Sequence, residues 1–164
     1  MEKKDLEMIN LLADFLDESG INSQITEIGD RYVLDVEISD ENGFAPESCL
    51  ISVEHPNEES TCVQLWMILF SDMKESTTDD IAALMTTLNS KIIVGHFGLV
   101  KDEGCMYCAY SFLTDSLDEM SVLTSFAAGI DLIAGSAAAC RKALIPLVNG
   151  EVTLGQISES ELFT

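Results

Sequence analysis

Two apolar runs joined by a short polar turn constrain the fold of this chain more than any other stretch. The runs cover residues 92–100 and 105–113, and both are rich in β-branched and aromatic side chains. The turn between them, residues 101–104, reads KDEG and ends in a glycine. Two such runs around a glycine-ended turn are typical of a β-hairpin. The sequence therefore predicts two adjacent antiparallel strands here.

Earlier segments of the chain add further strands. In residues 31–38 the even-numbered positions are apolar and most of the odd-numbered ones are charged, which predicts a half-buried strand. Residues 49–55 form another candidate, and residues 21–29 form a weaker one. Residues 62–70 are almost continuously apolar, which is typical of a central strand covered on both faces. The polar residues 40–43, followed by Pro46, predict a break between strands.

Apolar residues at helical spacing predict three helices, over about residues 4–19, 77–89 and 116–145. Gly20 suits the left-handed residue after the first helix. Thr77 and Asp80 resemble a capping box at the start of the second helix. Ser116 is the expected N-cap of the third helix, and Pro146 is expected to end it.

The predicted elements follow the order helix, three or four strands, helix, two strands, helix. Runs of consecutive strands pair in an antiparallel sense, and the helices then gather on one face. We therefore predict an α+β fold with an antiparallel sheet of five to six strands and helices at the N-terminus, in the middle and at the C-terminus. We expect one domain over residues 1–150. Residues 151–164 would form an acidic C-terminal tail that is loose or docked on a neighbouring chain.

Charge narrows the range of partners. The chain has 8 Lys and Arg residues against 29 Asp and Glu residues, a formal net charge of −21 at pH 7. Such a surface repels the phosphate backbone of nucleic acids and anionic membrane surfaces. We therefore expect no nucleic-acid partner. The acidity serves solubility, or it makes the chain a carrier for basic or aggregation-prone partners.

Two segments bear on location. Glu7 and Asp14 interrupt the apolar region that a signal peptide would need near the N-terminus. Residues 121–140 contain one charged residue, Asp131, and are rich in Ser, Thr, Gly and Ala. We interpret that segment as a buried helix rather than a membrane span. We thus expect a cytoplasmic protein with reduced cysteines and no membrane insertion.

A family resemblance rests on four short motifs in the second half of the chain: Leu88-Asn89-Ser90, Gly95-His96-Phe97-Gly98-Leu99, Asp102-Glu103-Gly104 and Tyr107-Cys108-Ala109-Tyr110. With the element order and the acidity, they make the chain resemble the bacterial YbjN family and the type III secretion chaperone-like fold that this family shares. The resemblance covers about residues 5–150 and is strongest after Thr77. It implies a homodimer with a protein-binding role, chaperone-like or regulatory, and it carries over no catalytic residue. The long final helix and the acidic tail differ from the secretion chaperones.

One motif has chemical potential, the pair Cys105 and Cys108. Redox pairs of this spacing lie at a helix N-terminus, which lowers a thiol pKa. Here the pair begins a predicted strand, where positions three apart point to opposite faces. A zinc site needs about four ligands, and His96 across the hairpin is the candidate for a third. We expect small apolar core residues, and the alternative is a metal-binding or thiol-redox protein.

Gly95 and Gly98 lie inside the predicted strand 92–100. Glycine weakens a strand and marks a bulge or the close approach of another backbone. We predict that a helix packs over this point, and the alternative is a bound peptide.

No arrangement of nucleophile, base and phosphate loop stands out in a chain with two histidines. We therefore expect no enzyme and no cofactor. The hypothesis is a homodimeric module that binds another polypeptide, either by strand addition or in shallow apolar pockets. The candidate residues of the partner or dimer surface are Trp66, Ile81, Leu84, Met85 and Leu88. For each of them a core position is the alternative.

Overall fold

The computed structural model of the chain describes residues 2–29, 31–38 and 47–157. Its helices and strands are, in chain order, α1 (Glu2–Glu18), β1 (Ser23–Ile28), β2 (Arg31–Ile38), β3 (Glu47–Asn57), β4 (Ser60–Phe70), α2 (Glu75–Lys91), β5 (His96–Val100), β6 (Cys105–Leu113) and α3 (Glu119–Val148). Two short 3-10 turns, η1 (Lys101–Glu103) and η2 (Leu154–Gln156), complete the described elements. The predicted α+β class is confirmed, with four strands before α2. The predicted break at residues 40–46 lies outside the described residues.

The strands form one six-stranded sheet in the order β1-β2-β3-β4-β6-β5. Every pairing between neighbours is antiparallel. The predicted hairpin is β5 with β6, and its turn is η1 followed by Gly104 in the left-handed conformation, with φ at 56°. This is the position where only glycine avoids a steric cost. The sheet has two edges, β1 and β5.

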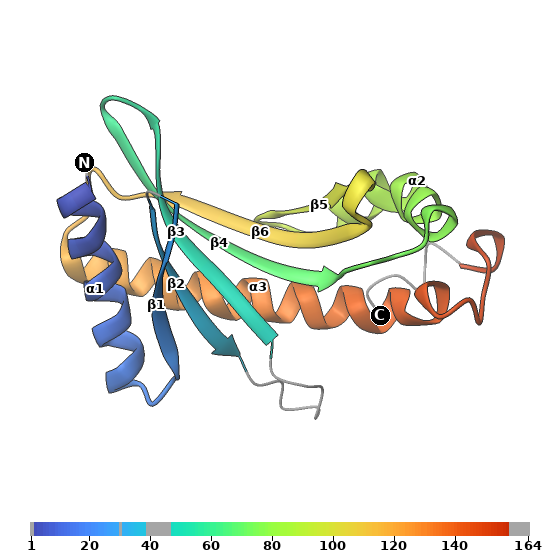
Figure 1. Ribbon diagram of the computed structural model, residues 1–164, viewed down its shortest axis with the longest axis horizontal. Helices are drawn as coiled ribbons and strands as arrows, with labels where there is room; N and C mark the ends of the chain where they lie inside the picture. The colour runs from blue at the N-terminus through green and yellow to red at the C-terminus, as the bar shows by residue number, and fades with distance from the viewer. Residues whose placement is uncertain (1, 30, 39–46, 158–164) are drawn as a thin grey trace.

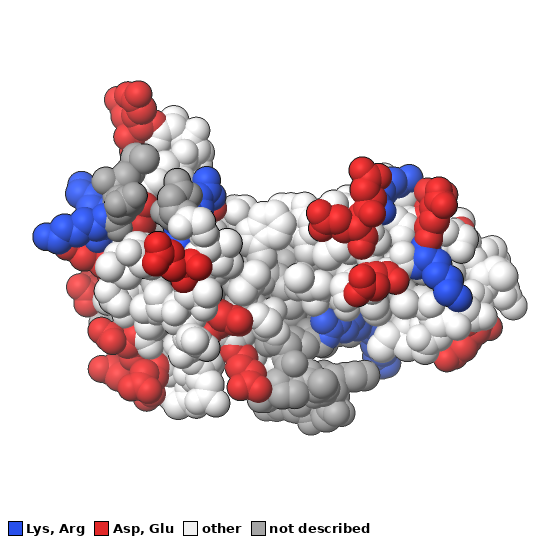
Figure 2. Space-filling view, viewed as in Figure 1, with Lys and Arg blue, Asp and Glu red and all other residues white. Residues whose placement is uncertain are grey.

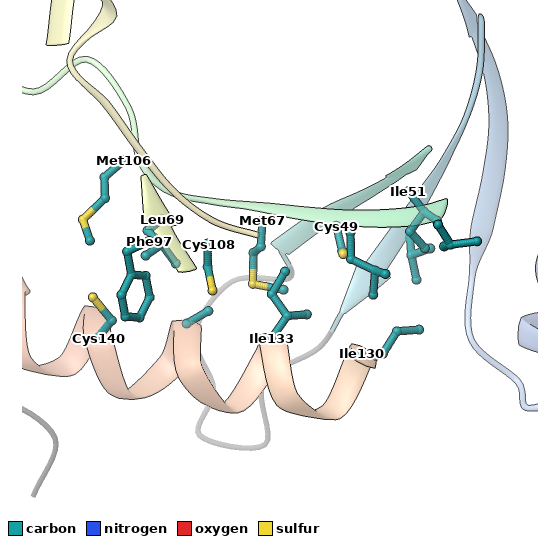
Figure 3. Close-up of a cluster of buried hydrophobic side chains, with 14 of the residues drawn as sticks. Cys49, Ile51, Met67, Leu69, Phe97, Met106, Cys108, Ile130, Ile133 and Cys140 are labelled. Carbon is teal, nitrogen blue, oxygen red and sulfur yellow. The ribbon is translucent and has the colours of Figure 1, made fainter. Parts of the chain in front are cut away.

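The three helices bury their apolar residues against the same face of the sheet (Figure 1). α3 runs beneath the middle strands and contacts β4 and β6, whereas α1 contacts β1, β2 and β3 at one end and α2 contacts β5 at the other. Figure 3 shows the core between β4, β6 and α3, where side chains from the strands point down onto the helix. Fully burying an aliphatic side chain contributes about 1.5–3 kcal/mol to stability. This layer is therefore the main source of the fold's stability.

α3 is, by length and composition alone, one helix within the described ranges that could cross a membrane. Its apolar side has another explanation, because it lies on the sheet. The buried residues of α3 are Val122, Phe126, Gly129, Ile130, Ile133, Ala137, Cys140, Leu144 and Leu147. The expectation of a core helix is consistent with this packing.

The ends of α2 and α3 differ from the predicted ones because contacts distant in sequence fix them. The backbone N–H of Met73 donates to the carbonyl of Gly104, and α2 begins directly after this tie, at Glu75 rather than at Thr77. Thr61 is bonded to both Thr114 and Asp115, which holds the segment before α3 against the start of β4.

The N-cap of α3 is consequently Asp118 and not Ser116. Its side chain accepts a hydrogen bond from the N–H of Ser121 at 2.8 Å. The side chain of Ser121, followed by this N–H, lowers the pKa of the Asp118 carboxyl. Pro146 does not end α3, which continues to Val148. A proline in the last turn removes one hydrogen bond, and the buried Leu147 keeps that turn packed on the core.

Residues 92–95 do not belong to β5, contrary to the prediction. The strand begins at His96, because Gly95 has a φ of +82° that turns the chain. Ile93 is 99% exposed in that bend. At the C-terminal end, Val152, Leu154 and Ile157 pack against the chain's own core. Residues 151–157 are therefore docked rather than loose, and residues 158–164 lie outside the described part.

Candidate functional site: the open face of the sheet

The face of the sheet opposite the helices, called the open face here, carries uncharged side chains on three adjacent strands. In β4 the buried residues Val63, Leu65 and Met67 point to the helices, so the residues between them point to the open face. Of these, Trp66 is half-buried and Ile68 is 48% exposed. The prediction that residues 62–70 are covered on both faces is therefore wrong. β4 is central, but helices cover one of its faces.

An aromatic strip crosses the open face at its centre. It consists of Trp66 on β4, Tyr107 on β6 and His96 on β5. The rings of Trp66 and Tyr107 have centroids 4.6 Å apart and planes tilted by 35°. The ring of His96 stands edge-on to Tyr107, with centroids 6.1 Å apart. Aromatic pairs in such arrangements contribute about 0.5–1.5 kcal/mol beyond their buried area, so the strip has a fixed shape.

Small residues make room for these rings. Across the three strands, Trp66 pairs with Ala109 and Ala109 with His96, while Ile68 pairs with Tyr107 and Tyr107 with Gly98. Ala109 is fully buried. A Cβ at Gly98 would lie 2.1 Å from Cζ of Tyr107, so the Tyr107 ring occupies the space above that glycine.

This packing explains why glycines occupy positions 95 and 98. A tyrosine side chain on the open face covers Gly98, and the predicted helix does not. Gly95 has the close backbone approach that was the basis of the prediction, since a Cβ there would lie 2.6 Å from the carbonyl oxygen of Ala109. The glycines therefore shape the open face from within the chain.

The free edge of β5 is closed by a side chain of α2. The amide of Asn89 donates to the carbonyl of Phe97 at 3.0 Å, and its oxygen accepts from the N–H of Phe97 at 2.7 Å. The neighbouring Leu88 is fully buried. An edge strand with free backbone groups is a template for an added strand, and Asn89 occupies these groups at Phe97, the second residue of β5. Sequence reasoning noted the Leu-Asn pair but assigned it no physical role.

Carboxylates stand at both ends of the open face, and the polar pair Gln64 and Ser111 lies between the aromatic strip and the hairpin tip. Glu58 and Glu59 are exposed at the tip of the β3–β4 hairpin, and Asp102 and Glu103 are exposed in the β5–β6 turn. Figure 2 shows an uncharged surface, hollowed between the hairpin tip and the end that carries α2, with acidic groups and some Lys or Arg on both sides. The apolar centre is thus flanked by negative charge.

The other half of the open face is polar and internally paired. Arg31 on β2 lies opposite Glu54 on β3, and its guanidinium donates to both carboxylate oxygens at 2.9 and 3.0 Å. Asp35 accepts a hydrogen bond from Ser48. A hollow of about 850 Å³ beside this half is lined by further acidic residues, among them Asp14, Asp17 and Glu37. This half adds negative potential, and its apolar residues include Ile28, which is 55% exposed, and Leu50, which pairs with Trp66.

The five residues predicted as a partner or dimer surface are not brought together. Ile81 and Leu88 are fully buried, Leu84 is 9% exposed, and Met85 packs against the same core. They belong to the helix-covered side, where the alternative of a core position describes them. Trp66 is the member of the set on the open face. Its neighbours Tyr107 and Ile68 were missed, although the apolar alternation in residues 62–70 was a signal for Ile68.

The Cys105 and Cys108 side chains point to opposite faces, as strand geometry predicted. Cys108 is in the core, and burial raises the pKa of its thiol to about 12. Burial also raises the pKa of Cys105, and the carboxylates of Glu103 and Asp72 raise it further. Reactive cysteines need a lowered pKa, so the environment of this pair opposes thiolate chemistry.

The remaining cysteines are core residues with raised thiol pKa values. Cys49 and Cys140 lie in the same buried layer between the sheet and α3 as Cys108 (Figure 3), and burial is the largest cause that raises the pKa of each thiol to about 12. Across residues 2–29, 31–38 and 47–157, no group of three or more His, Cys, Asp or Glu side chains is placed to hold a metal ion. His96 lies against Tyr107 on the open face, whereas Cys108 is on the other face.

A chain of polar contacts that no sequence motif predicted joins α1 to the β3–β4 hairpin. Nε2 of His55 lies 2.8 Å from Oδ1 of Asp5, and Nδ1 lies 3.4 Å from the hydroxyl of Thr61. An acid, a histidine and a hydroxyl in this order have the connectivity of a hydrolase triad. The hydroxyl contact is long, and the Asp5 contact joins α1 to β3. We interpret the chain as a structural tie that positions α1.

Comparisons with known proteins agree with the fold. No protein-family model matches the sequence, and no curated protein matches it. Among solved structures, the chain is similar to the crystal structure of YbjN from E. coli, a candidate transcription regulator, with a TM-score of 0.48 and 11% sequence identity over 84% of this chain and 91% of that chain. The resemblance to YbjN stated from the sequence is confirmed as a similarity of fold. It says nothing about which surface this chain uses.

Proposed function

We propose that this chain is a non-enzymatic protein-binding module, a chaperone-like or regulatory adaptor of the cytoplasm, and that it binds polypeptide on the open face. The observation that carries the proposal is the asymmetry of the sheet. One face is covered by three helices, while on the other, within residues 2–29, 31–38 and 47–157, no helix covers Trp66, Tyr107 and His96.

The residue types on the open face suit a polypeptide partner. Tryptophan and tyrosine supply large contact areas with few rotatable bonds and dominate the energetics of protein interfaces. Ile68, Val100 and Leu113 add exposed aliphatic surface, at 48%, 38% and 60% of their side-chain accessibility. Ile68 lies beside Tyr107 in the strip, whereas Leu113 lies beyond Gln64 and Ser111. Exposed apolar surface next to an aromatic cluster supports an interaction site.

The structure also favours one of the two binding modes considered from the sequence. Strand addition needs free backbone groups at a sheet edge, and at the β5 edge, which adjoins the aromatic strip, Asn89 occupies those of Phe97; the β1 edge lies on the far side of the sheet from that strip. Docking in shallow pockets on the face needs no edge. We therefore propose that the partner lies across β4, β6 and β5. A homodimer is part of the proposal, and light scattering of the purified chain tests it.

A photo-crosslinking amino acid placed at one position at a time tests the contact directly. The test position is Ile68 on the open face, and the matched control is Leu132, which is 45% exposed on α3. We expect crosslinks to a polypeptide from position 68 and none from position 132. Crosslinking from neither position, or equally from both, contradicts binding on the open face.

A further inference from the structure

We infer that the open face takes a polypeptide segment with an apolar or aromatic centre and Lys or Arg residues on both sides of that centre. This inference rests on the proposed function and names the partner chemistry of the same surface. It follows from the distribution of charge on the face and from its length.

The centre of the face offers shape and no charge. Trp66 and Tyr107 form a tilted pair, and Ile68 and Val100 continue the apolar surface beside them. A segment that lies here gains by burying apolar side chains, at about 25 cal/mol per Å² removed from water. A charged residue at the centre of the segment would lose its hydration without gaining a partner.

The two ends of the face offer unpaired negative charge. Glu58 and Glu59 lie at the hairpin tip, and Asp102 and Glu103 lie in the β5–β6 turn. Within the described ranges, none of these four carboxylates forms an ion pair. By contrast, Glu54 on the polar half is paired with Arg31. Charge complementarity therefore calls for basic residues where a segment leaves the apolar centre.

The length of β4 sets the spacing between the basic groups. β4 has 11 residues, and its start adjoins the hairpin tip while its end lies near the start of β6. At about 3.3 Å per residue its ends are roughly 36 Å apart. An extended segment spans this distance with about eleven residues, whereas a helix at about 1.5 Å per residue needs about 24. Twist of the sheet shortens the distance, so these are upper values.

The same charges argue against the other occupants. A nucleic acid is a polyanion and would meet the same repulsion at both ends. A second copy of this chain carries a net charge of −21 and the same four carboxylates. A basic segment is the occupant that gains from all of these groups at once.

A peptide titration tests the inference with a built-in reporter, since Trp66 is the single tryptophan of the chain. Three tryptophan-free peptides share one apolar centre and carry flanks of Lys, of Glu or of Ser and Gly, and binding is followed by Trp66 emission. Exposed ion pairs are each worth a few-fold at most, so four of them give the Lys-flanked peptide an advantage of roughly tenfold. The advantage should shrink as salt rises from about 50 mM to about 500 mM.

Charge reversal on the protein identifies the groups responsible. The double variants Glu58→Lys with Glu59→Lys, and Asp102→Lys with Glu103→Lys, should each weaken the Lys-flanked peptide several-fold and strengthen the Glu-flanked one. The matched control is Asp14→Lys with Asp17→Lys on α1, which changes the net charge equally at exposed positions away from the aromatic strip. It should leave the preference for Lys flanks within about twofold, because exposed charges beyond a Debye length are screened.

The possible outcomes distinguish a failure of the basic-flank inference from a failure of the proposed function. Equal binding of all three peptides, or an unchanged preference for Lys flanks in both test variants, overturns the inference. The chain would then be a binding module that recognises apolar side chains only. A change of Trp66 emission with protein concentration and no peptide, together with a dimeric mass, overturns it in favour of a second copy. The absence of crosslinks from position 68 removes the proposed function itself.

Discussion

Two glycines of the same helix should respond with opposite sign to the same substitution. Gly135 is exposed on α3, and a Cβ there meets no atom within 4 Å. Gly135→Ala should therefore stabilise the fold by about 0.5–1 kcal/mol, the difference in helix propensity between the two residues. Gly129 is buried, and its added Cβ would lie 2.7 Å from Cε1 and 2.9 Å from Cδ1 of Tyr110.

The contact at Gly129 cannot relax cheaply. The two atoms lie in the body of the Tyr110 ring, which stacks on Phe112 with centroids 6.0 Å apart. Overpacking a core costs about 1–3 kcal/mol, which exceeds the propensity gain of about 1 kcal/mol. Gly129→Ala should thus destabilise the fold by up to about 2 kcal/mol. The two variants should differ by about 1–3 kcal/mol, since the propensity gain is common to both and cancels.

Urea unfolding followed by Trp66 emission and by far-ultraviolet circular dichroism measures this difference. With a urea dependence of about 2 kcal/mol per molar, the midpoints of the two variants should be about 0.5–1.5 M apart. Tyr110→Leu removes the ring, and a double-mutant cycle with Gly129→Ala should then recover about 1 kcal/mol or more of coupling. Equal stabilisation by both alanines would refute the packing of α3 on the sheet.

Two further predictions concern the sheet edge and the buried thiols. Asn89→Ala should lower the free energy of unfolding in urea by about 1–2 kcal/mol and increase self-association measured by light scattering, because it frees backbone groups of an edge strand. The control Ser90→Ala removes an exposed hydrogen bond within α2 and should change stability by less than about 0.5 kcal/mol. Equal effects of the two substitutions would count against the role of Asn89. Three thiols have a folded-state pKa raised to about 12 from a reference of 9.0, so the unfolded chain releases these protons first and stability should fall as pH rises above about 9. Urea midpoints between about pH 8 and about pH 10.5 should decline less steeply after Cys140→Ala, and an unchanged slope would contradict the burial of that thiol.

Local signals were enough to predict most elements of the fold. The alternation in residues 31–38 marks β2 with its observed bounds, and the glycine that ends the KDEG turn is the residue that adopts a left-handed conformation there. Both signals act through neighbours along the chain, in the strand period and in the steric limit on φ. Such features can be read without knowing what packs on them.

Contacts distant in sequence decided what local signals could not. Ser116 and Asp118 are both suitable N-cap residues, and the bonds between Thr61 and the segment before α3 selected Asp118. Leu84 and Leu88 present an apolar helical face, which is compatible with a core or with an interface. The choice between these depends on the sheet that α2 meets, and the sheet is assembled from strands far apart in the chain.

The candidate site, too, depends on contacts that the local sequence does not determine. A strand such as β4, which is apolar on both faces, is predicted to be covered on both faces. Its sequence does not determine how many layers of helices or strands the domain has. On the helix-covered face, Leu65 and Met67 are packed by α3, whereas Trp66 is packed by Tyr107, a side chain of the same sheet. On the open face, side chains of neighbouring strands therefore bury part of one another's apolar surface, and the outer surface of the rings stays exposed. A sheet that needed only solubility on that face could have used the polar alternation of β2. Because the rings lie over Gly98 and Ala109, and the carboxylates beside them are at the hairpin tip and in the β5–β6 turn, this part of the face is where we propose that another chain binds.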